Sequence, residues 1–327
     1  MSMRKLSIVS TGRNDDHGGR FIDRVYASIR SISELARVRD FRFEYIFVEW
    51  NPVPDKLLIA SMDHLWKPLT NPHFDIRFII VPTEYHNAIQ YSDQLPIFQM
   101  ISKNIGIRRA KYDAILATTS DILFGPFLSE IFQGYTCHTD MFYRCARYDI
   151  SQKCLDYPTY HDQVTNCHSY VLRQYPPYKD HNKLYTNACG DFTLAHREVW
   201  DTVKGYIEWP MYSIHIDSLF LIVATHLGIK QKIFPPGARI YHIEHEESWT
   251  PDRSQLVGKS IDDKGIPRIP DCCIYEYANV IVKGTVPGNK KNWGALGLDF
   301  KEITYRGIMD GITSSKSSHK SSANVLY

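Results

Sequence analysis

A single carboxylate, Asp121, stands where an apolar run stops in the stretch ATTSDILFG. An acid flanked by small hydroxyl residues suits either a surface turn or a metal site, because hard cations such as Mg²⁺ and Mn²⁺ take mainly oxygen ligands. His242 and His245 lie close together in YHIEH, and an imidazole can complete such a site or only form hydrogen bonds. Asp191 in ACGD and Asp217 in HIDS add carboxylates that can accept a proton, although an acid at a helix start, as predicted for Asp217, also stabilises the helix.

Hydrophobic periodicity predicts the elements that must position these side chains. Short apolar runs indicate strands, and apolar residues three to four apart indicate helices. The predicted strands are 6–10, 45–48, 76–81 and 115–117, and the predicted helices lie around 21–32 and 101–110. Strands that alternate with helices favour an α/β fold, in which a mainly parallel sheet is covered by helices on both sides. In such folds ligands bind beyond the carboxyl ends of the strands.

Polar residues gather at these predicted strand ends. Thr11, Arg13 and Asn14 follow the first strand, Glu49 ends the second, and Asp121 comes after the fourth. Turn residues are often polar for backbone reasons alone, so a capped turn or a surface acid is the simpler explanation for each one separately. The motifs GxGxxG and GxxxxGK[ST] do not occur in the sequence, which argues against dinucleotide and P-loop sites.

The order of these segments resembles that of the GT-A glycosyltransferases, especially family 2. The segment NIGIRRAKYDAILATTSD, residues 104–121, is similar to the family's RNxGxxxA-like helix and the strand that ends in its DxD metal motif. LSIVSTGRN and FEYIFVEWN are similar to the family's first two nucleotide-binding strands. The segments NACGDFTLAHREVWDTVKGY, SIHIDSLFLIVATHLGI and IYHIEHEESW are placed like its sugar and acceptor lining, its acidic helix start and its late metal-binding histidine. The resemblance covers roughly residues 5–250 and implies a GT-A, Rossmann-like fold.

The resemblance also implies a divalent cation, Mn²⁺ or Mg²⁺, bound by Asp121 with His242 and His245. Of the two histidines, His242 is preferred because it lies closer to the end of a predicted strand at 239–241. The chain departs from the family where Thr119 replaces the first acid of the DxD motif. One carboxylate with a histidine, water and diphosphate oxygens can still complete a six-coordinate ion.

The activity implied is transfer of a sugar from a nucleotide-diphosphate sugar, with UDP or GDP, to a hydroxyl of a glycan or glycoconjugate. Asp217 is the predicted general base of an inverting displacement, and Asp191 either competes for that role or binds the sugar or the acceptor. The predicted contacts to the nucleotide sugar are Thr11, Arg13, Asn14, Glu49, Asn104, Ser120 and Gly190.

Two other functions are open. A catalytically silent nucleotide-sugar binder would explain the reduced DxD motif. A metal-dependent hydrolase would use His215, Asp217, His242 and His245. A zinc site is a minor alternative, and its residues would be Cys137, His138, Cys167 and His168. The irregular spacing of the seven cysteines, without a CxxC pair, favours reduced thiols instead.

The predicted domain organisation is one catalytic domain with an extension. Residues 1–250 form the catalytic domain, with a nucleotide-binding half to about 125 and an acceptor half from about 126. The acceptor half carries an aromatic-rich insertion, 135–185, which either recognises the acceptor, forms a lid, or merely packs. Residues 251–312 are predicted to pack on this domain, with a loop at 252–271 and a peripheral element at 274–282, and 313–327 form a flexible tail.

Bulk composition is that of a folded globular protein. The chain of 327 residues is 43% hydrophobic and 23% charged, with a formal net charge of +2. This balance gives no reason to expect nucleic acid as a partner. The N-terminal apolar stretch is too short for a signal sequence or membrane anchor, so a cytoplasmic protein without an integral membrane segment is expected. The oligomeric state is left open.

Overall fold

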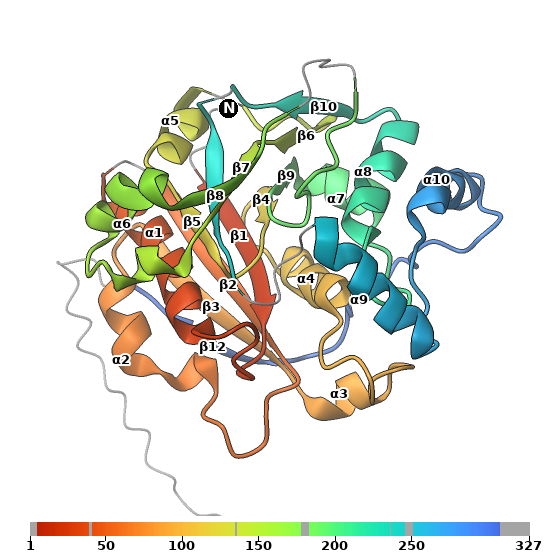
Figure 1. Cartoon of the computed structure of the whole chain (residues 1–327), viewed down its shortest axis with the longest axis horizontal. Helices are drawn as coiled ribbons and strands as arrows, with labels where there is room; N and C mark the ends of the chain where they lie inside the picture. The colour runs from red at the N-terminus through yellow and green to blue at the C-terminus, as the bar shows by residue number, and fades with distance from the viewer. Residues whose placement is uncertain are drawn as a thin grey trace, which may run out of the picture.

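An eight-stranded sheet forms the centre of the computed structural model, which describes residues 5–38, 41–134, 136–177, 183–235, 237–245 and 251–307 (Figure 1). The strand order is β10-β6-β9-β4-β1-β2-β3-β12. The strands are β1 (Lys5–Gly12), β2 (Arg42–Trp50), β3 (Phe74–Val81), β4 (Ala114–Ala117), β6 (Met141–Arg144), β9 (Thr193–His196), β10 (Lys230–Ile233) and β12 (Lys301–Tyr305). β9 and β12 run antiparallel to their neighbours, and the other strands share one direction. The prediction of a mainly parallel α/β sheet is therefore confirmed.

Helices cover both faces of this sheet, as the sequence predicts. They are α1 (Phe21–Val38), α2 (Asp63–Trp66), α3 (Thr83–Asn87), α4 (Gln99–Arg108), α5 (Phe127–Gly134), α6 (Tyr160–Asn166), α7 (Arg197–Val203), α8 (Ile216–His226), α9 (Pro251–Asp263) and α10 (Ile274–Val282). Short 3₁₀ helices are η1 (Ile59–Ser61), η2 (Lys67–Leu69), η3 (Gln152–Asp156), η4 (Cys167–Tyr170) and η5 (Asp271–Cys273). Successive residues of a strand point to opposite faces, so Ile8 of β1 enters the core shared with α1 and Val9 enters the core shared with α4.

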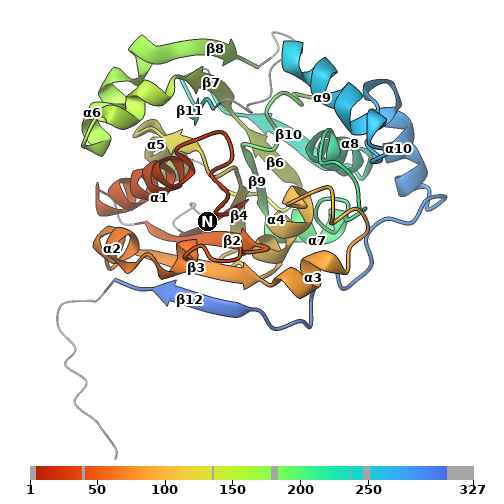
Figure 2. The same cartoon turned by 60° about the horizontal axis from the view of Figure 1, so that its bottom comes forward.

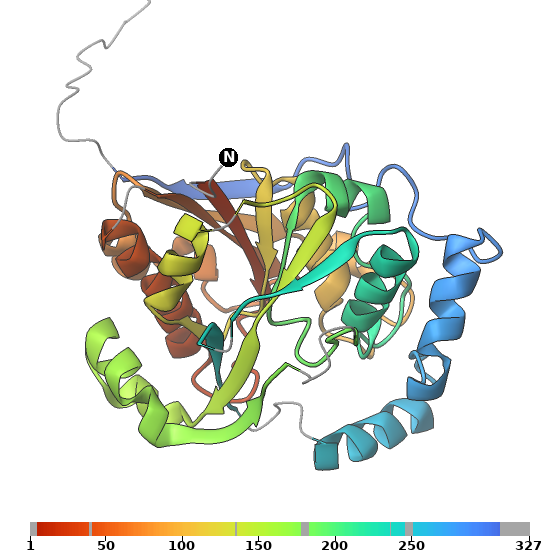
Figure 3. The ribbon, with the colours of Figure 1, turned by 90° about the horizontal axis from the view of Figure 1, so that it is seen from above.

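A second, smaller sheet stands beside the first and supplies half of the candidate site. Its order is β5-β11-β7-β8, from β5 (Ile122–Phe124), β11 (Arg239–Ile243), β7 (Ala146–Ile150) and β8 (Val171–Tyr175). Its own apolar cluster includes Leu123, Ile150 and Ile243. Figure 3 shows β8 and α6, in light green, on the opposite side of the molecule from α9 and α10, in blue. The aromatic-rich insertion thus builds β6, β7, β8 and α6 and packs, whereas a lid or acceptor role stays a prediction.

The C-terminal segment supplies the last strand of the large sheet and two helices. β12 pairs with β3 and becomes the edge of the large sheet, where Figure 2 shows it in blue along β3. The prediction of a loop at 252–271 is wrong, because the helix α9 occupies the first half of this segment. Beyond that helix Ile266 and Ile269 are buried, and Arg268 donates to both oxygens of Asp262 at 2.8 Å, which fixes the turn that follows α9. The element predicted at 274–282 is α10, and the predicted tail lies outside the described residues.

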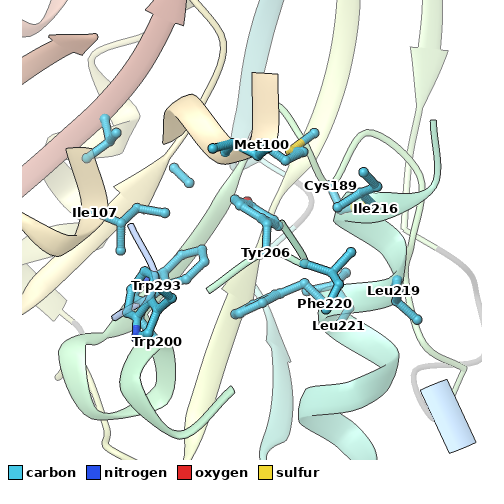
Figure 4. Close-up of a cluster of buried hydrophobic side chains, with 14 of the residues drawn as sticks. Met100, Ile107, Cys189, Trp200, Tyr206, Ile216, Leu219, Phe220, Leu221 and Trp293 are labelled. Atoms are coloured by element: carbon cyan, nitrogen blue, oxygen red, sulfur yellow. The ribbon is translucent and has the colours of Figure 1, made fainter. Parts of the chain in front are cut away.

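An aromatic cluster anchors α8, the helix that carries Asp217 (Figure 4). The rings of Trp200 and Phe220 stack with centroids 4.5 Å apart, and Tyr206 meets Trp200 edge-on at 5.4 Å. Trp293 from the C-terminal segment is buried in the same cluster. Such ring pairs add stability beyond their buried area, so the start of α8 is held on a rigid support.

Among the described residues, no helix has the length and apolar character needed to cross a bilayer.

Candidate metal centre and active site

Asp121 lies between the two sheets, directly before β5. Asp121 is only 6% exposed. Arg24 of α1 donates a hydrogen bond to its Oδ2 at 3.0 Å. Of the two environments that the sequence allows for this acid, its burial does not fit the surface turn. Its other oxygen, Oδ1, is buried and makes no hydrogen bond within the described part of the chain. A carboxylate oxygen left in this state is a candidate ligand for a cation.

His242 and His245 meet Asp121 because β11 pairs with β5. The antiparallel register places His242 opposite Ile122, the neighbour of Asp121. The Nε2 atoms of His242 and His245 lie 3.7 Å and 3.3 Å from Asp121 Oδ2. Gly18, with φ +68°, allows the close approach of its loop, since a Cβ there would overlap the ring of His245.

Asp149 lies against His242 and was not identified from the sequence. The parallel register of β7 and β11 pairs it with His242, and its Oδ1 lies 3.2 Å from His242 Nδ1. Asp149 is fully buried and accepts from Arg147 Nε at 2.7 Å and Arg173 Nε at 3.2 Å. Metal-binding histidines commonly offer their second nitrogen to a carboxylate, which fixes the ring and its tautomer. The signal in the sequence is ARYDI, where Arg147 and Asp149 share one face of a strand.

The charges of this cluster are strongly coupled. Burial and the charge of Arg147 act to lower the pKa of His242, but Asp121 and Asp149 outweigh them and raise it to about 9. Burial would raise the pKa of Asp121, yet the two histidines hold it well below its ordinary value. Burial lowers the pKa of His245, in spite of the nearby Asp121. When no cation is bound, a protonated His242 therefore adds to the positive charge that Arg24 and Arg147 bring to these carboxylates.

A second acidic cluster is built around Asp191. Arg147 Nη1 forms a short ion pair with Asp191 Oδ2, and Thr119 donates to Asp191 Oδ1 at 3.0 Å. Thr118 donates to the backbone carbonyl of Asp191 at 2.7 Å. The hydroxyl that replaces the first acid of the DxD motif therefore binds another side chain of the site.

Asp217 lies in the first turn of α8, as predicted, and faces Gly190. Asp217 Oδ2 accepts from the backbone N–H of Gly190 at 2.7 Å, and Oδ1 accepts from Ser218 N at 2.9 Å. A Cβ at residue 190 would lie 2.9 Å from Asp217 Oδ2, which explains the glycine. The carbonyl of Gly190 accepts from Lys103 Nζ at 2.7 Å. Burial lowers the pKa of Lys103, while the charges of Asp191, Asp217 and Asp121 oppose that shift.

Three of the predicted nucleotide contacts have hydrogen-bond partners within the chain. Thr11 donates to the Val48 carbonyl at 2.9 Å. Both oxygens of Glu49 cap η1, by accepting from the N–H groups of residues 59 and 60 at 2.8 and 3.0 Å, and burial raises its pKa. Asn104 is fully buried and binds the backbone of Tyr206 through both of its amide atoms, at 2.7 and 2.9 Å. The structure thus gives these side chains partners within the chain and does not bring them into the acidic cluster.

The other predicted nucleotide contacts remain near the surface of the strand-end loops or beside the cluster. Arg13 and Asn14 are half-buried, and they donate at 2.7 Å to the carbonyls of Asn51 and Leu57. Ser120 is buried next to Asp121, and Gly190 lies against Asp217.

The donor set fits a divalent transition metal. Asp121, His242 and His245 each offer an atom within 4.8 Å of the others. Bonds near 2.1 Å place adjacent ligand atoms of one ion roughly 3.0–3.5 Å apart, and the histidine nitrogens lie 3.7 Å and 3.3 Å from Asp121 Oδ2. Two imidazoles with one carboxylate suit Mn²⁺ better than Mg²⁺, which prefers oxygen ligands.

The alternative metal sites are not assembled. In the parts of the chain that the structure describes, the cluster above is the one group of three or more such ligands close enough to hold an ion. His215, required by the hydrolase hypothesis, instead pairs with Asp271 at 2.5 Å. Cys167 is buried beside Cys154 in the apolar cluster of the small sheet, and all seven cysteines are free thiols.

Comparison with known proteins gives only distant similarities. No protein-family model matches this chain, and no curated protein sequence matches it. Among solved structures it is similar to TarS of S. aureus (residues 1–349), with a TM-score of 0.46 and 12% identity over 85% of this chain and 69% of that one. It is also similar to the catalytic domain of Drosophila β1,4-galactosyltransferase 7, solved with xylobiose, with a TM-score of 0.36 and 11% identity over 78% of this chain and 79% of that one. Function therefore has to come from the side chains of the site.

Proposed function

We propose that this protein is a GT-A glycosyltransferase that moves a sugar from a nucleotide-diphosphate sugar to a hydroxyl of a glycan or glycoconjugate. The observation that carries the proposal is the assembly of Asp121, His242 and His245 into one buried cluster beyond the carboxyl end of β4, a strand of the parallel sheet. That edge is where α/β folds bind their ligands. The second acidic cluster, with Asp191 and the nearby Asp217, is proposed to face the sugar and the acceptor.

The three clustered side chains would hold Mn²⁺ in preference to Mg²⁺, because two of their donor atoms are imidazole nitrogens. When bound, such a cation neutralises negative charge on a leaving diphosphate. Asp149 orients His242, and Arg24 holds the second oxygen of Asp121. The nucleotide part of the donor, UDP or GDP, is proposed to lie along the loop that carries Arg13 and Asn14.

Asp217 is the better candidate for the general base. Asp191 is already engaged by Arg147 and Thr119, so its carboxylate is suited to binding and not to taking up a proton. Asp217 is half-buried and accepts from backbone N–H groups, which fixes its position and leaves lone pairs available. The acceptor hydroxyl passes its proton to Asp217 as its oxygen bonds to the anomeric carbon. The bond from that carbon to the diphosphate oxygen breaks on the opposite face, which inverts the configuration.

A ligand screen tests the proposal. Thermal unfolding is followed with UDP, GDP, CMP and dTDP sugars, each with Mn²⁺ and with a chelator, because ligands that bind only the folded state raise its stability. We expect one nucleotide class to raise the midpoint, and to do so more strongly with Mn²⁺. A protein that no nucleotide sugar stabilises in either condition would contradict the assignment.

The silent binder differs from the enzyme in one measurable way. Thr119 is built into the site by its bond to Asp191, so the reduced motif is an organised part of the cluster. Release of free nucleotide diphosphate from the bound donor, with or without an acceptor sugar, identifies the enzyme. Donor that stays intact across a panel of acceptors identifies the binder.

A further inference from the structure

Arg147 is a buried arginine with one unused end inside the candidate site. Arg147 is 6% exposed, and its Nε and Nη1 pair with Asp149 and Asp191. Its guanidinium lies over the ring of Tyr175, with the carbon 4.9 Å from the ring centroid. Its third nitrogen, Nη2, is buried and has no hydrogen-bond partner among the described residues. A buried donor in this state is costly, and a bound ligand is a direct way to satisfy it.

The charges around Arg147 indicate which ligand chemistry suits this nitrogen. Arg147 and Arg173 together balance the charges of Asp149 and Asp191, so a further anionic oxygen would be buried here without a cation of its own, which is costly. A neutral oxygen is acceptable. The ionised carboxylate of Asp191, which binds the adjacent nitrogen, can accept hydrogen bonds but cannot donate them. Arg147 Nη2 can donate but cannot accept. A hydroxyl both donates and accepts, so it matches this pair of neighbours.

The position of the pair distinguishes the donor sugar from the acceptor. Arg147 is connected to the candidate metal centre by Asp149. The Oδ1 atom of Asp149 lies 2.7 Å from Arg147 Nε and 3.2 Å from His242 Nδ1. The cation is proposed to bind the diphosphate, to which the donor sugar is attached. Asp217, on the other side of Gly190, is left for the acceptor hydroxyl.

We infer that Arg147 and Asp191 together bind a hydroxyl of the donor sugar and so determine donor specificity. This inference rests on the proposed function. It predicts that Arg147 contributes to the affinity for the sugar of a nucleotide sugar and contributes little to the affinity for the nucleotide diphosphate alone.

The test compares these two affinities in the full-length protein with Mn²⁺. Calorimetry is first run with UDP-glucose, UDP-galactose, UDP-N-acetylglucosamine and GDP-mannose, and the tightest donor is compared with its free diphosphate. In Arg147→Lys, which keeps a charge but loses the guanidinium fork, we expect affinity for the donor to fall about 10- to 100-fold and affinity for the diphosphate to change by less than about twofold.

The matched control is Arg173→Lys. Arg173 also pairs with Asp149, at 3.2 Å, but its second ion-pair partner is Glu244 and not Asp191. We expect this variant to leave the ratio of donor to diphosphate affinity unchanged. If Arg147→Lys does not fold, as judged by its thermal transition, Asp191→Asn replaces it. That variant retains an oxygen beside Arg147, and the same selective loss for the donor is expected.

Three results would overturn the inference, and they have different meanings. Equal losses for donor and diphosphate would mean that Arg147 binds phosphate. An unchanged ratio in both Arg147→Lys and Asp191→Asn would mean that neither side chain contacts the sugar, while the proposed function survives. A wild-type protein that binds none of the four donors would remove the proposed function, and this inference with it.

Discussion

Asp149 and His242 face each other across the parallel pair β7 and β11, with Oδ1 and Nδ1 3.2 Å apart. This contact directs the other imidazole nitrogen toward Asp121. The same carboxylate accepts from Arg147, which pairs in turn with Asp191. One buried acid therefore connects the candidate metal centre with the candidate sugar site.

Removing that acid's charge is expected to weaken metal binding. Asp149→Asn keeps the size of the side chain but no longer stabilises the His242 tautomer that binds a cation, so Mn²⁺ affinity should fall roughly 10- to 100-fold. Calorimetric titration with Mn²⁺ measures it. The control for a lost surface charge is Asp201→Asn. Asp201 is an exposed acid of α7 that pairs with Arg108 of α4. Unchanged Mn²⁺ affinity in a folded Asp149→Asn protein would exclude a role for Asp149 in supporting the metal.

Metal binding should depend on pH in a defined direction. The pKa of His242 is raised to about 9 in the metal-free protein, and a cation can bind only its neutral form. Mn²⁺ affinity is therefore expected to rise by up to about tenfold per pH unit between pH 6.5 and 9, with release of about one proton. Titrations in buffers of different ionisation enthalpy count that proton. A flat profile over this range would show that His242 is not a ligand.

The stability of the metal-free protein should change in the opposite sense. A histidine whose folded-state pKa is raised contributes stability that is fully present below its ordinary pKa of 6.5 and is lost as pH rises through about 9. The loss is on the order of 3 kcal/mol. Urea unfolding at pH 6.5, 8 and 9.5 with a chelator measures it, and His242→Asn should flatten the profile.

The two acids of the second cluster should separate binding from chemistry. Asp217→Asn keeps size and hydrogen bonds but cannot accept a proton, so donor affinity should persist while transfer falls by roughly 10²- to 10⁴-fold. Asp191→Asn should instead raise the KM for the donor. An active Asp217→Asn protein beside an inactive, donor-binding Asp191→Asn protein would reverse these roles. Retention of the anomeric configuration, read by NMR, would remove the need for this base.

Thr119 is expected to act on the sugar side and not on the metal. Thr119→Val removes the hydroxyl that donates to Asp191 at 3.0 Å, so the KM for the donor should rise about 5- to 20-fold with unchanged Mn²⁺ affinity. Thr119→Ser retains the hydroxyl and should behave like the wild type. A loss of Mn²⁺ affinity in Thr119→Val would instead make Thr119 a metal ligand.

Much of this arrangement could be predicted because it follows from local pattern. Apolar runs and helical spacing identify β1 to β4, α1 and α4, and the common strand direction brings their ends to one edge. The proximity of Asp121 to His242 and His245 was expected from the resemblance to the GT-A family, and the structure places these three side chains together.

Other features depend on pairing between distant segments, which no local pattern reveals. Asp149 meets His242 only through the β7 and β11 register. Glu49 and Asn104 have the residue types of ligand contacts, but burial leads them to bind the backbone of neighbouring segments. The helix α9 was missed because its sequence has few apolar residues and contains Gly258, and its buried face becomes evident only against the rest of the core.

The most direct test of the metal-dependent donor site is a calorimetric titration of the best nucleotide sugar into wild type and Asp121→Asn, each with Mn²⁺ and with a chelator. The amide is chosen because Asp121 is buried against Arg24, so that alanine would leave a hole beside an unpaired charge. Asp113→Asn, at an exposed acid paired with Arg197, is the control. We predict that Mn²⁺ tightens donor binding at least about tenfold in the wild type and in the control, and that Asp121→Asn folds but loses this dependence. The same Mn²⁺ dependence in Asp121→Asn as in the wild type would contradict the account.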